Sequence, residues 1–138
     1  MQCGCGATVS IRILLVDDSL TFVGAVRQFL DMLPGADVVG ESVDGNDALE
    51  KIRTLSPDLV LLDVTMPGMG GLELARTLRL WPKSPAVVFL SMHDATAYQS
   101  MALELGALAY INKSDFVVQL LPIIERMVAD DVPPIYEV

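Results

Sequence analysis

Residues 59–71 read LVLLDVTMPGMGG, and this stretch places a single carboxylate, Asp63, between an apolar run and a loop rich in proline and glycine. Four consecutive apolar residues are typical of a parallel strand that is covered on both faces. Pro67 and the glycines after it predict a turn into a helix. We therefore expect Asp63 at the exposed carboxyl end of a central strand.

The same pattern repeats along the chain, because short apolar runs alternate with amphipathic stretches. Strands are predicted at 11–16, 37–42, 59–62, 86–90 and 108–111, and helices at 19–33, 46–55, 71–80, 95–105 and 116–129. The second run, DVVGES, is more polar than the others, which predicts an edge strand. Pro122 lies within the last helical stretch, so either that helix bends there or its regular part begins only a few residues earlier.

Strand–helix alternation with right-handed crossovers predicts an α/β protein with a parallel sheet between two layers of helices. We expect a flavodoxin-like, doubly wound (βα)5 sandwich whose five strands take the order 2-1-3-4-5. The expected domain covers residues 11–129. Residues 1–10 are expected to form a disordered leader, and residues 130–138 a C-terminal tail or the start of a linker.

The length of the chain and its net charge argue against several classes of function. A chain of 138 residues is one ordinary domain, and its net charge of −9 argues against direct binding to nucleic acid or to anionic lipid. Neither a signal peptide nor an apolar run long enough for a membrane span is present, which favours the cytoplasm. Cys3 and Cys5 stand in the leader, where two cysteines alone make a poor zinc site and no disulfide framework.

Chemically competent side chains follow four of the five predicted strands. In a parallel sheet these positions share one edge, where ligands bind. Taken alone, an acid after a strand is commonly a helix cap, and for Asp18 or Ser19 a role as the cap of the first helix is as good an interpretation as a role in a site. The convergence of several strand ends is what favours a site, and its members are Asp17, Asp18, Asp63, Ser91 and Lys113.

Three carboxylates at one edge repel one another unless a cation lies among them. An all-oxygen set favours Mg²⁺, with Mn²⁺ as the alternative, over zinc. Asp63, Asp17 or Asp18, and a backbone carbonyl near Thr65 are the expected ligands. Because Mg²⁺ commonly recruits phosphate, the cluster indicates phosphoryl chemistry.

A carboxylate can also accept a phosphoryl group and form an acyl phosphate. In the 2-1-3-4-5 order the third strand lies between the first and the fourth, so Asp63 is the expected acceptor. Ser91 would donate a hydrogen bond to one phosphoryl oxygen, and Lys113 would neutralise another.

With these residues in place, the chain resembles the response-regulator receiver domains of two-component signalling. The resemblance covers about residues 11–128 and rests on ILLVDDS, PDLVLLDVTMPGMGGLEL, VVFLSMHD and GALAYINKSD, in the order typical of that family. It implies phosphorylation of Asp63 by a sensor histidine kinase or a phosphotransfer protein. It also implies Mg²⁺ held by Asp17, Asp18, Asp63 and the Thr65 carbonyl, and a phosphate-binding switch formed by Ser91, Lys113 and Tyr110.

Two loop residues and one substitution refine this resemblance. Thr65 and His93 occupy variable positions that in the family tune the lifetime of the phosphate, although a plain loop histidine is the alternative for His93. Ser114 stands where many receivers have a proline after the lysine.

The sequence is most similar to receivers that precede LuxR-type helix-turn-helix domains. This similarity implies that phosphorylation changes protein–protein contacts, such as homodimerisation, and controls transcription through a DNA-binding domain absent from this chain. The sequence does not separate the receiver of such a longer transcription factor from a stand-alone regulator. The chain would be no enzyme beyond its own phosphorylation and dephosphorylation. Two alternatives stay open: a pseudo-receiver that is not phosphorylated in use, and a haloacid dehalogenase-type phosphatase, which needs a second acid where Thr65 stands.

Overall fold

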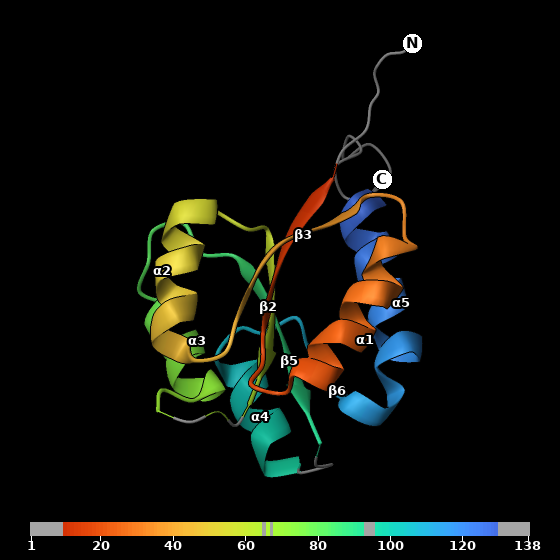
Figure 1. Ribbon diagram of the computed structural model, residues 1–138. Coiled ribbons are helices and arrows are strands. Elements are labelled where there is room, and N and C mark those ends of the chain that lie inside the picture. Colours follow the sequence, from red (N-terminus) through yellow and green to blue (C-terminus); the bar gives the residue numbers. More distant parts are fainter. Residues whose placement is uncertain (1–9, 65, 67, 93–95, 130–138) are drawn as a thin grey trace, which may run out of the picture.

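Five parallel strands form one sheet in the order β3-β2-β4-β5-β6, which in chain order is the predicted 2-1-3-4-5 (Figure 1). The computed structural model describes residues 10–64, 66, 68–92 and 96–129. The strands are β2 (Ile11–Val16), β3 (Ala36–Ser42), β4 (Leu59–Asp63), β5 (Ala86–Ser91) and β6 (Ala109–Asn112). The helices are α1 (Leu20–Asp31), α2 (Gly45–Leu55), α3 (Gly71–Leu78), α4 (Thr96–Glu104) and α5 (Phe116–Ala129), with the short 3-10 helix η1 (Lys113–Asp115) before α5.

Helices cover both faces of the sheet, and successive side chains along each strand point to opposite faces. In β2, Ile13 and Leu15 pack with α1 and α5, whereas Leu14 and Val16 pack with α2 and α3. Figure 1 shows α1 and α5 side by side on one face and α2 and α3 on the other. Two apolar layers therefore hold the sheet in place, and the fold agrees with the predicted doubly wound sandwich.

Strand β4 is the centre of this arrangement. It pairs with β2 on one side and with β5 on the other, and all five of its residues are buried. A strand enclosed in this way cannot shift its register without moving its apolar side chains to the wrong layer. The backbone of Asp63, at the end of β4, is therefore rigidly placed.

The polar second run forms an edge strand, as predicted. Strand β3 lies at the end of the sheet, most of its residues are only partly buried, and its register with β2 shifts between Ile13 and Leu14. Helix α5 begins at Phe116 and continues beyond Pro122, whose ring is exposed to solvent. The helix thus runs through the proline position, with its buried residues Leu120 and Ile124 on the face opposite the solvent.

Element boundaries differ from the prediction by at most a few residues, and helix α1 ends at Asp31 rather than at residue 33. The predicted leader and tail, with Cys3 and Cys5, lie outside the described residues, apart from Ser10. Within the described part of the chain, no helix is both long enough and apolar enough to cross a membrane.

Candidate functional site at the carboxyl edge of the sheet

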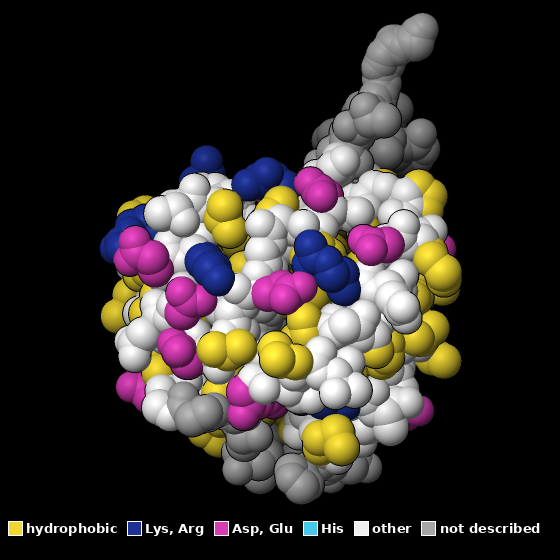
Figure 2. Space-filling view, viewed as in Figure 1, with side chains coloured by type: hydrophobic (Ala, Val, Ile, Leu, Met, Phe, Trp, Pro, Cys, Tyr) yellow, Lys and Arg dark blue, Asp and Glu magenta, His cyan; other side chains and the backbone are white. Residues whose placement is uncertain are grey.

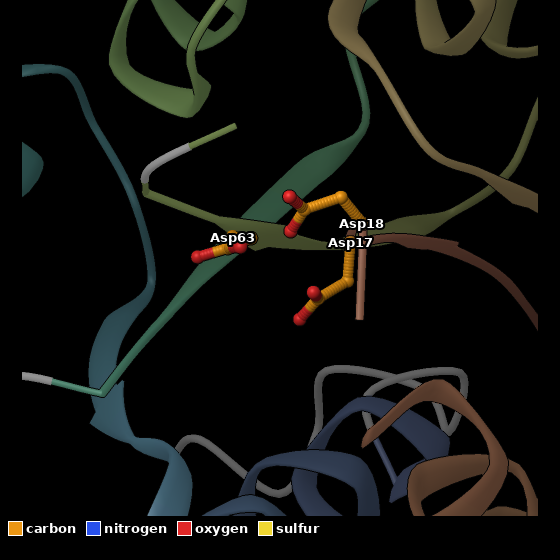
Figure 3. Close-up of side chains that lie close together, drawn as sticks. All are labelled: Asp17, Asp18 and Asp63. Carbon is orange, nitrogen blue, oxygen red and sulfur yellow. The ribbon is translucent and has the colours of Figure 1, made fainter. Parts of the chain in front are cut away.

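Three carboxylates meet where β2 and β4 end. Asp17 and Asp18 follow β2, and Asp63 closes β4. One oxygen from each of the three side chains lies within 4.8 Å of the other two. Figure 3 shows the three carboxyl groups around a common space, with Asp18 extending toward Asp63. The structure therefore brings together the acids that the sequence predicts.

The three acids differ in burial. Asp17 and Asp63 are buried, with 2% and 4% of their surface exposed, whereas Asp18 is exposed. An exposed carboxylate beside two buried ones leaves the cluster open to solvent on one side. A small ion or a phosphorylated group can reach the cluster from that side.

Lys113 directly follows β6 and supplies the countercharge at the same carboxyl edge of the sheet. Its ammonium lies 2.7 Å from Asp17 Oδ2 and 3.5 Å from Asp63 Oδ2, and only 6% of its side chain is exposed. Nζ also lies over the ring of Phe22 in α1, at 4.7 Å from the ring centre. Three groups from β2, β4 and α1 therefore surround one buried cation.

The turn that carries Lys113 is shaped by the residues on each side of it. The Asn112 side chain accepts hydrogen bonds from the Ser114 backbone N–H at 2.9 Å and from Ser114 Oγ at 2.8 Å. A proline after the lysine would lack that N–H donor. Ser114 thus contributes two hydrogen bonds to the turn at the start of η1.

Helix α1 begins at the site, and the structure shows that Ser19, rather than Asp18, is its N-cap. Ser19 is the N-cap and accepts a hydrogen bond from the Phe22 N–H at 3.4 Å, while the Ser19 N–H donates to Asp17 Oδ1 at 2.8 Å. Asp18 takes no part in this capping. Its carboxylate is therefore available to the acidic cluster.

Of the other predicted site residues, the structure describes two, Ser91 and Tyr110. Ser91 closes β5, directly beside β4, and is buried with 4% exposure. Tyr110 lies in β6, opposite Phe89, and packs against the layer of α2 and α3. Thr65 and His93 lie outside the described residues, so their predicted roles stay predictions.

The residues present suit a hard divalent cation. Three carboxylates against one ammonium leave two net negative charges, and all the side-chain donors are oxygens, which Mg²⁺ prefers. Among the described residues, Asp17 Oδ2 is a buried oxygen that accepts no hydrogen bond, although the Lys113 ammonium lies 2.7 Å from it in an ion pair. That oxygen retains lone pairs for another ligand.

A second polar network lies beside the site, and sequence reasoning missed it. Ser42 Oγ, at the end of β3, donates to Asp47 Oδ2 at 2.7 Å, and the Lys51 ammonium lies 3.0 Å from the same oxygen. These hydrogen bonds, chiefly that from Ser42, hold the pKa of Asp47 below its ordinary value. Only the spacing of Asp47 and Lys51 on α2 could have revealed this network from the sequence.

Sequence reasoning also missed Phe22. The residue lies one position before the apolar stripe of α1, and nothing in its spacing distinguishes a core aromatic from one that contacts Lys113.

On the surface shown in Figure 2, Lys and Arg side chains lie among Asp and Glu rather than in a continuous basic stripe. That distribution agrees with the scattered basic residues of the sequence.

Comparison with known proteins identifies the family. The model of the response regulator receiver domain matches residues 13–125, and this match contains every site residue described above. The chain belongs to this family.

Its relatives carry receivers in two kinds of larger protein. The chain is 41% identical over 106 residues to a protein-glutamate methylesterase/protein-glutamine glutaminase of Desulfotalea psychrophila and 35% identical over 103 residues to the response regulator UvrY of Escherichia coli. Each match covers 75% of this chain, but only 29% of the methylesterase and 47% of UvrY. The receiver thus spans less than half of either relative.

A solved structure confirms the fold. A LuxR-family two-component response regulator from Aurantimonas sp. SI85-9A1 superimposes with a TM-score of 0.80 at 35% identity, covering 88% of this chain and 86% of that one. The receiver domain of the response regulator NarL from Mycobacterium tuberculosis gives a TM-score of 0.76 at 33% identity, covering 85% and 98% of the two chains. LuxR-type response regulators are therefore among its relatives, as the sequence predicts.

Proposed function

We propose that Asp63 accepts a phosphoryl group from the phosphohistidine of a sensor histidine kinase or a phosphotransfer protein. The observation that carries this proposal is the position of Asp63. Its carboxylate ends the most enclosed strand of the sheet, with two acids on one side and the Lys113 ammonium 3.5 Å away. A nucleophile fixed between a cation site and a countercharge suits phosphoryl transfer.

In the proposed transfer, one Asp63 oxygen attacks phosphorus and forms a P–O bond. The P–N bond to the histidine breaks, and its electron pair leaves with the imidazole. Lys113 is close enough to neutralise charge on the phosphoryl oxygens, and Ser91 is proposed to donate a hydrogen bond to one of them. The chain would catalyse this transfer and the later hydrolysis on itself alone.

Asp17, Asp18 and Asp63 would hold Mg²⁺, with the Thr65 carbonyl as a further proposed ligand and Mn²⁺ as an alternative ion. When bound, the ion would neutralise the carboxylates and stabilise negative charge on the phosphoryl oxygens. Thr65 and His93 are proposed to tune how long the phosphate survives.

The phosphoryl group would act by shifting an existing equilibrium. It adds about two negative charges beside Asp63, which favour a state in which Ser91 and Lys113 lie closer to that group. Tyr110, in the strand next to Ser91, is proposed to change position in the same transition. The output would be a changed protein–protein contact, such as homodimerisation in the cytoplasm.

The proposed output is control of transcription through a linked DNA-binding domain. Support comes from the similarity to the LuxR-family response regulator, because the match covers 86% of the chain in that solved structure. The methylesterase relatives favour a second candidate, in which the receiver regulates a linked catalytic domain. The reading frame that follows the codon of Val138 discriminates between the two, since the domains have unrelated sequences.

The central proposal is tested by incubating the chain with acetyl phosphate and Mg²⁺ and measuring the added mass of 80 Da, as expected for one phosphoryl group, by intact-protein mass spectrometry. Asp63→Asn should take up no phosphate. Asp58→Asn is the matched control, because Asp58 is an exposed acid just before the same strand. Equal uptake by wild type and Asp63→Asn would contradict the proposal.

Two alternatives give different results. A pseudo-receiver would bind its partner at full strength as Asp63→Ala without any phosphodonor. A haloacid dehalogenase-type phosphatase would hydrolyse a generic phosphate ester with multiple turnovers.

A further inference from the structure

The buried ammonium of Lys113 has an aromatic neighbour that the proposed chemistry does not use. Nζ lies 4.7 Å from the centre of the Phe22 ring, within the range of a cation–π attraction. The attraction is strongest where water is excluded, and the Lys113 side chain is only 6% exposed. The ring therefore covers one side of an ammonium that is largely shielded from water.

The Phe22 ring is itself held in place. The ring of Phe116, the first residue of α5, meets it edge-on at 5.3 Å between centres and 75° between planes. Phe116 follows the η1 turn that carries Lys113. One short segment therefore supplies both the cation above the Phe22 ring and the aromatic edge against it.

The groups around the Lys113 ammonium indicate the role of the Phe22 ring. An ammonium has three N–H donors, and Asp17 and Asp63 lie on two sides of this one, at 2.7 and 3.5 Å. An aliphatic residue at position 22 would leave the side of the ammonium that the ring now covers without electrostatic compensation. The ring compensates that side without bringing a further carboxylate into the site.

We propose that Phe22 is a positioning residue whose ring face holds the Lys113 ammonium between Asp17 and Asp63. The effect of Phe22 on phosphorylation rests on the proposed function of Asp63, whereas its effect on the ammonium does not. Phe22 touches no reacting atom, so it acts through Lys113 alone.

The test compares substitutions at two positions of the same helix. Phe22→Leu removes the ring under the cation, and Phe22→Met removes it with an unbranched side chain of nearly the same volume as leucine. Phe29→Leu is the matched control, because Phe29 is also half-buried in α1 and also meets Phe116 edge-on, at 5.7 Å. Phe22→Tyr keeps an aromatic face and should restore wild-type behaviour.

Two readouts are needed. The first is the ¹⁵N order parameter of the Lys113 ammonium, which we expect to fall in Phe22→Leu and Phe22→Met but not in Phe22→Tyr or Phe29→Leu. The second is the initial rate of phosphorylation by acetyl phosphate with Mg²⁺, which should fall about three- to tenfold in the same two variants. A less ordered ammonium reaches the position beside Asp63 in a smaller fraction of molecules.

The two readouts separate the possible failures. Wild-type order of the ammonium in both Phe22→Leu and Phe22→Met would overturn the proposal, and so would an equal loss of order in Phe29→Leu, which would indicate general loosening between α1 and α5. If the wild-type chain takes up no phosphate, the proposed function fails. The order parameter then decides alone whether Phe22 positions Lys113.

Discussion

Gly71 lies against the backbone of Asp63 so closely that a Cβ atom on Gly71 would stand 2.1 Å from the Asp63 carbonyl oxygen. The same Cβ would lie 2.9 Å from the Asp63 carbonyl carbon and 3.0 Å from Val64 Cα. These neighbours are backbone atoms of a strand buried on both faces, so they cannot rotate away as a flexible side chain would. Helix α3 therefore begins in direct contact with the residue that the site depends on.

The first prediction is that Gly71→Ala destabilises the protein by about 2–3 kcal/mol, because the added methyl group forces α3 away from β4. The measurement is the free energy of unfolding from urea denaturation. Gly24→Ala is the control, since Gly24 lies exposed in α1 and a Cβ added there would meet nothing within 4 Å beyond the neighbouring backbone of its own helix. That variant should gain about 0.5–1 kcal/mol from helix propensity. Equal stability of the two variants would show that α3 tolerates displacement.

The second prediction concerns the buried ammonium. Lys113→Met removes the countercharge from two buried carboxylates and should lower the free energy of unfolding in EDTA by about 3 kcal/mol. Added Mg²⁺ should recover part of this loss, because a cation among the carboxylates replaces the missing charge. Lys83→Met, at an exposed lysine, should change stability by less than about 0.5 kcal/mol. If Lys113→Met matched that control, the pairing with Asp17 and Asp63 would be energetically irrelevant.

The order of the strands and the acidic edge were accessible from the sequence because both follow from repeated, local patterns. Most of the strands read as nearly continuous apolar runs, and the residue after each run must appear at the carboxyl edge. The close contact between Gly71 and Asp63 could not be read in the same way. The sequence shows a glycine in a turn, whereas the need for glycine arises from how near α3 approaches β4.

The same distinction separates Lys113 from Phe22. A lysine just after a strand end is visible in the sequence, but the ring beneath it comes from a helix that begins about ninety residues earlier in the chain. Packing of α1 beside α5 creates that contact, and helical periodicity alone specifies only that Phe22 is near an apolar face. The choice between Asp18 and Ser19 as the cap of α1 likewise depended on side-chain direction, which the structure supplies.

The third prediction uses the exposed acid of the cluster. Asp18→Asn should weaken Mg²⁺ binding by about tenfold, because it removes one anionic oxygen ligand while leaving the buried pair of Asp17 and Lys113 intact. Isothermal titration calorimetry measures the affinity, and the free energy of unfolding without metal should stay close to that of wild type. Asp31→Asn, at an exposed acid at the far end of α1, is the control and should bind Mg²⁺ normally. Unchanged affinity in Asp18→Asn would remove Asp18 from the proposed ligands.

The fourth prediction concerns pH and the network beside the site. Hydrogen bonds from Ser42 and Lys51 lower the pKa of Asp47 from 3.8, so the ionised carboxylate is favoured in the folded protein. A lowered carboxyl pKa adds stability above the unfolded-state pKa, and that stability is lost as the pH falls through the folded-state pKa. Since 43% of the Asp47 side chain is exposed, solvent screening reduces the contribution to about 0.5 kcal/mol.

Asp47→Asn should therefore be less stable than wild type by that amount at pH 7, and the difference should shrink as the pH falls below 3.8. Urea denaturation of both proteins across pH 3–7 measures the difference directly. Asp37→Asn, at an exposed acid in the same edge strand that carries Ser42, serves as the control for the loss of one carboxylate. A constant difference across this range would mean that Asp47 contributes through packing or an uncharged hydrogen bond, because ionisation is the only part of its interaction that titrates there.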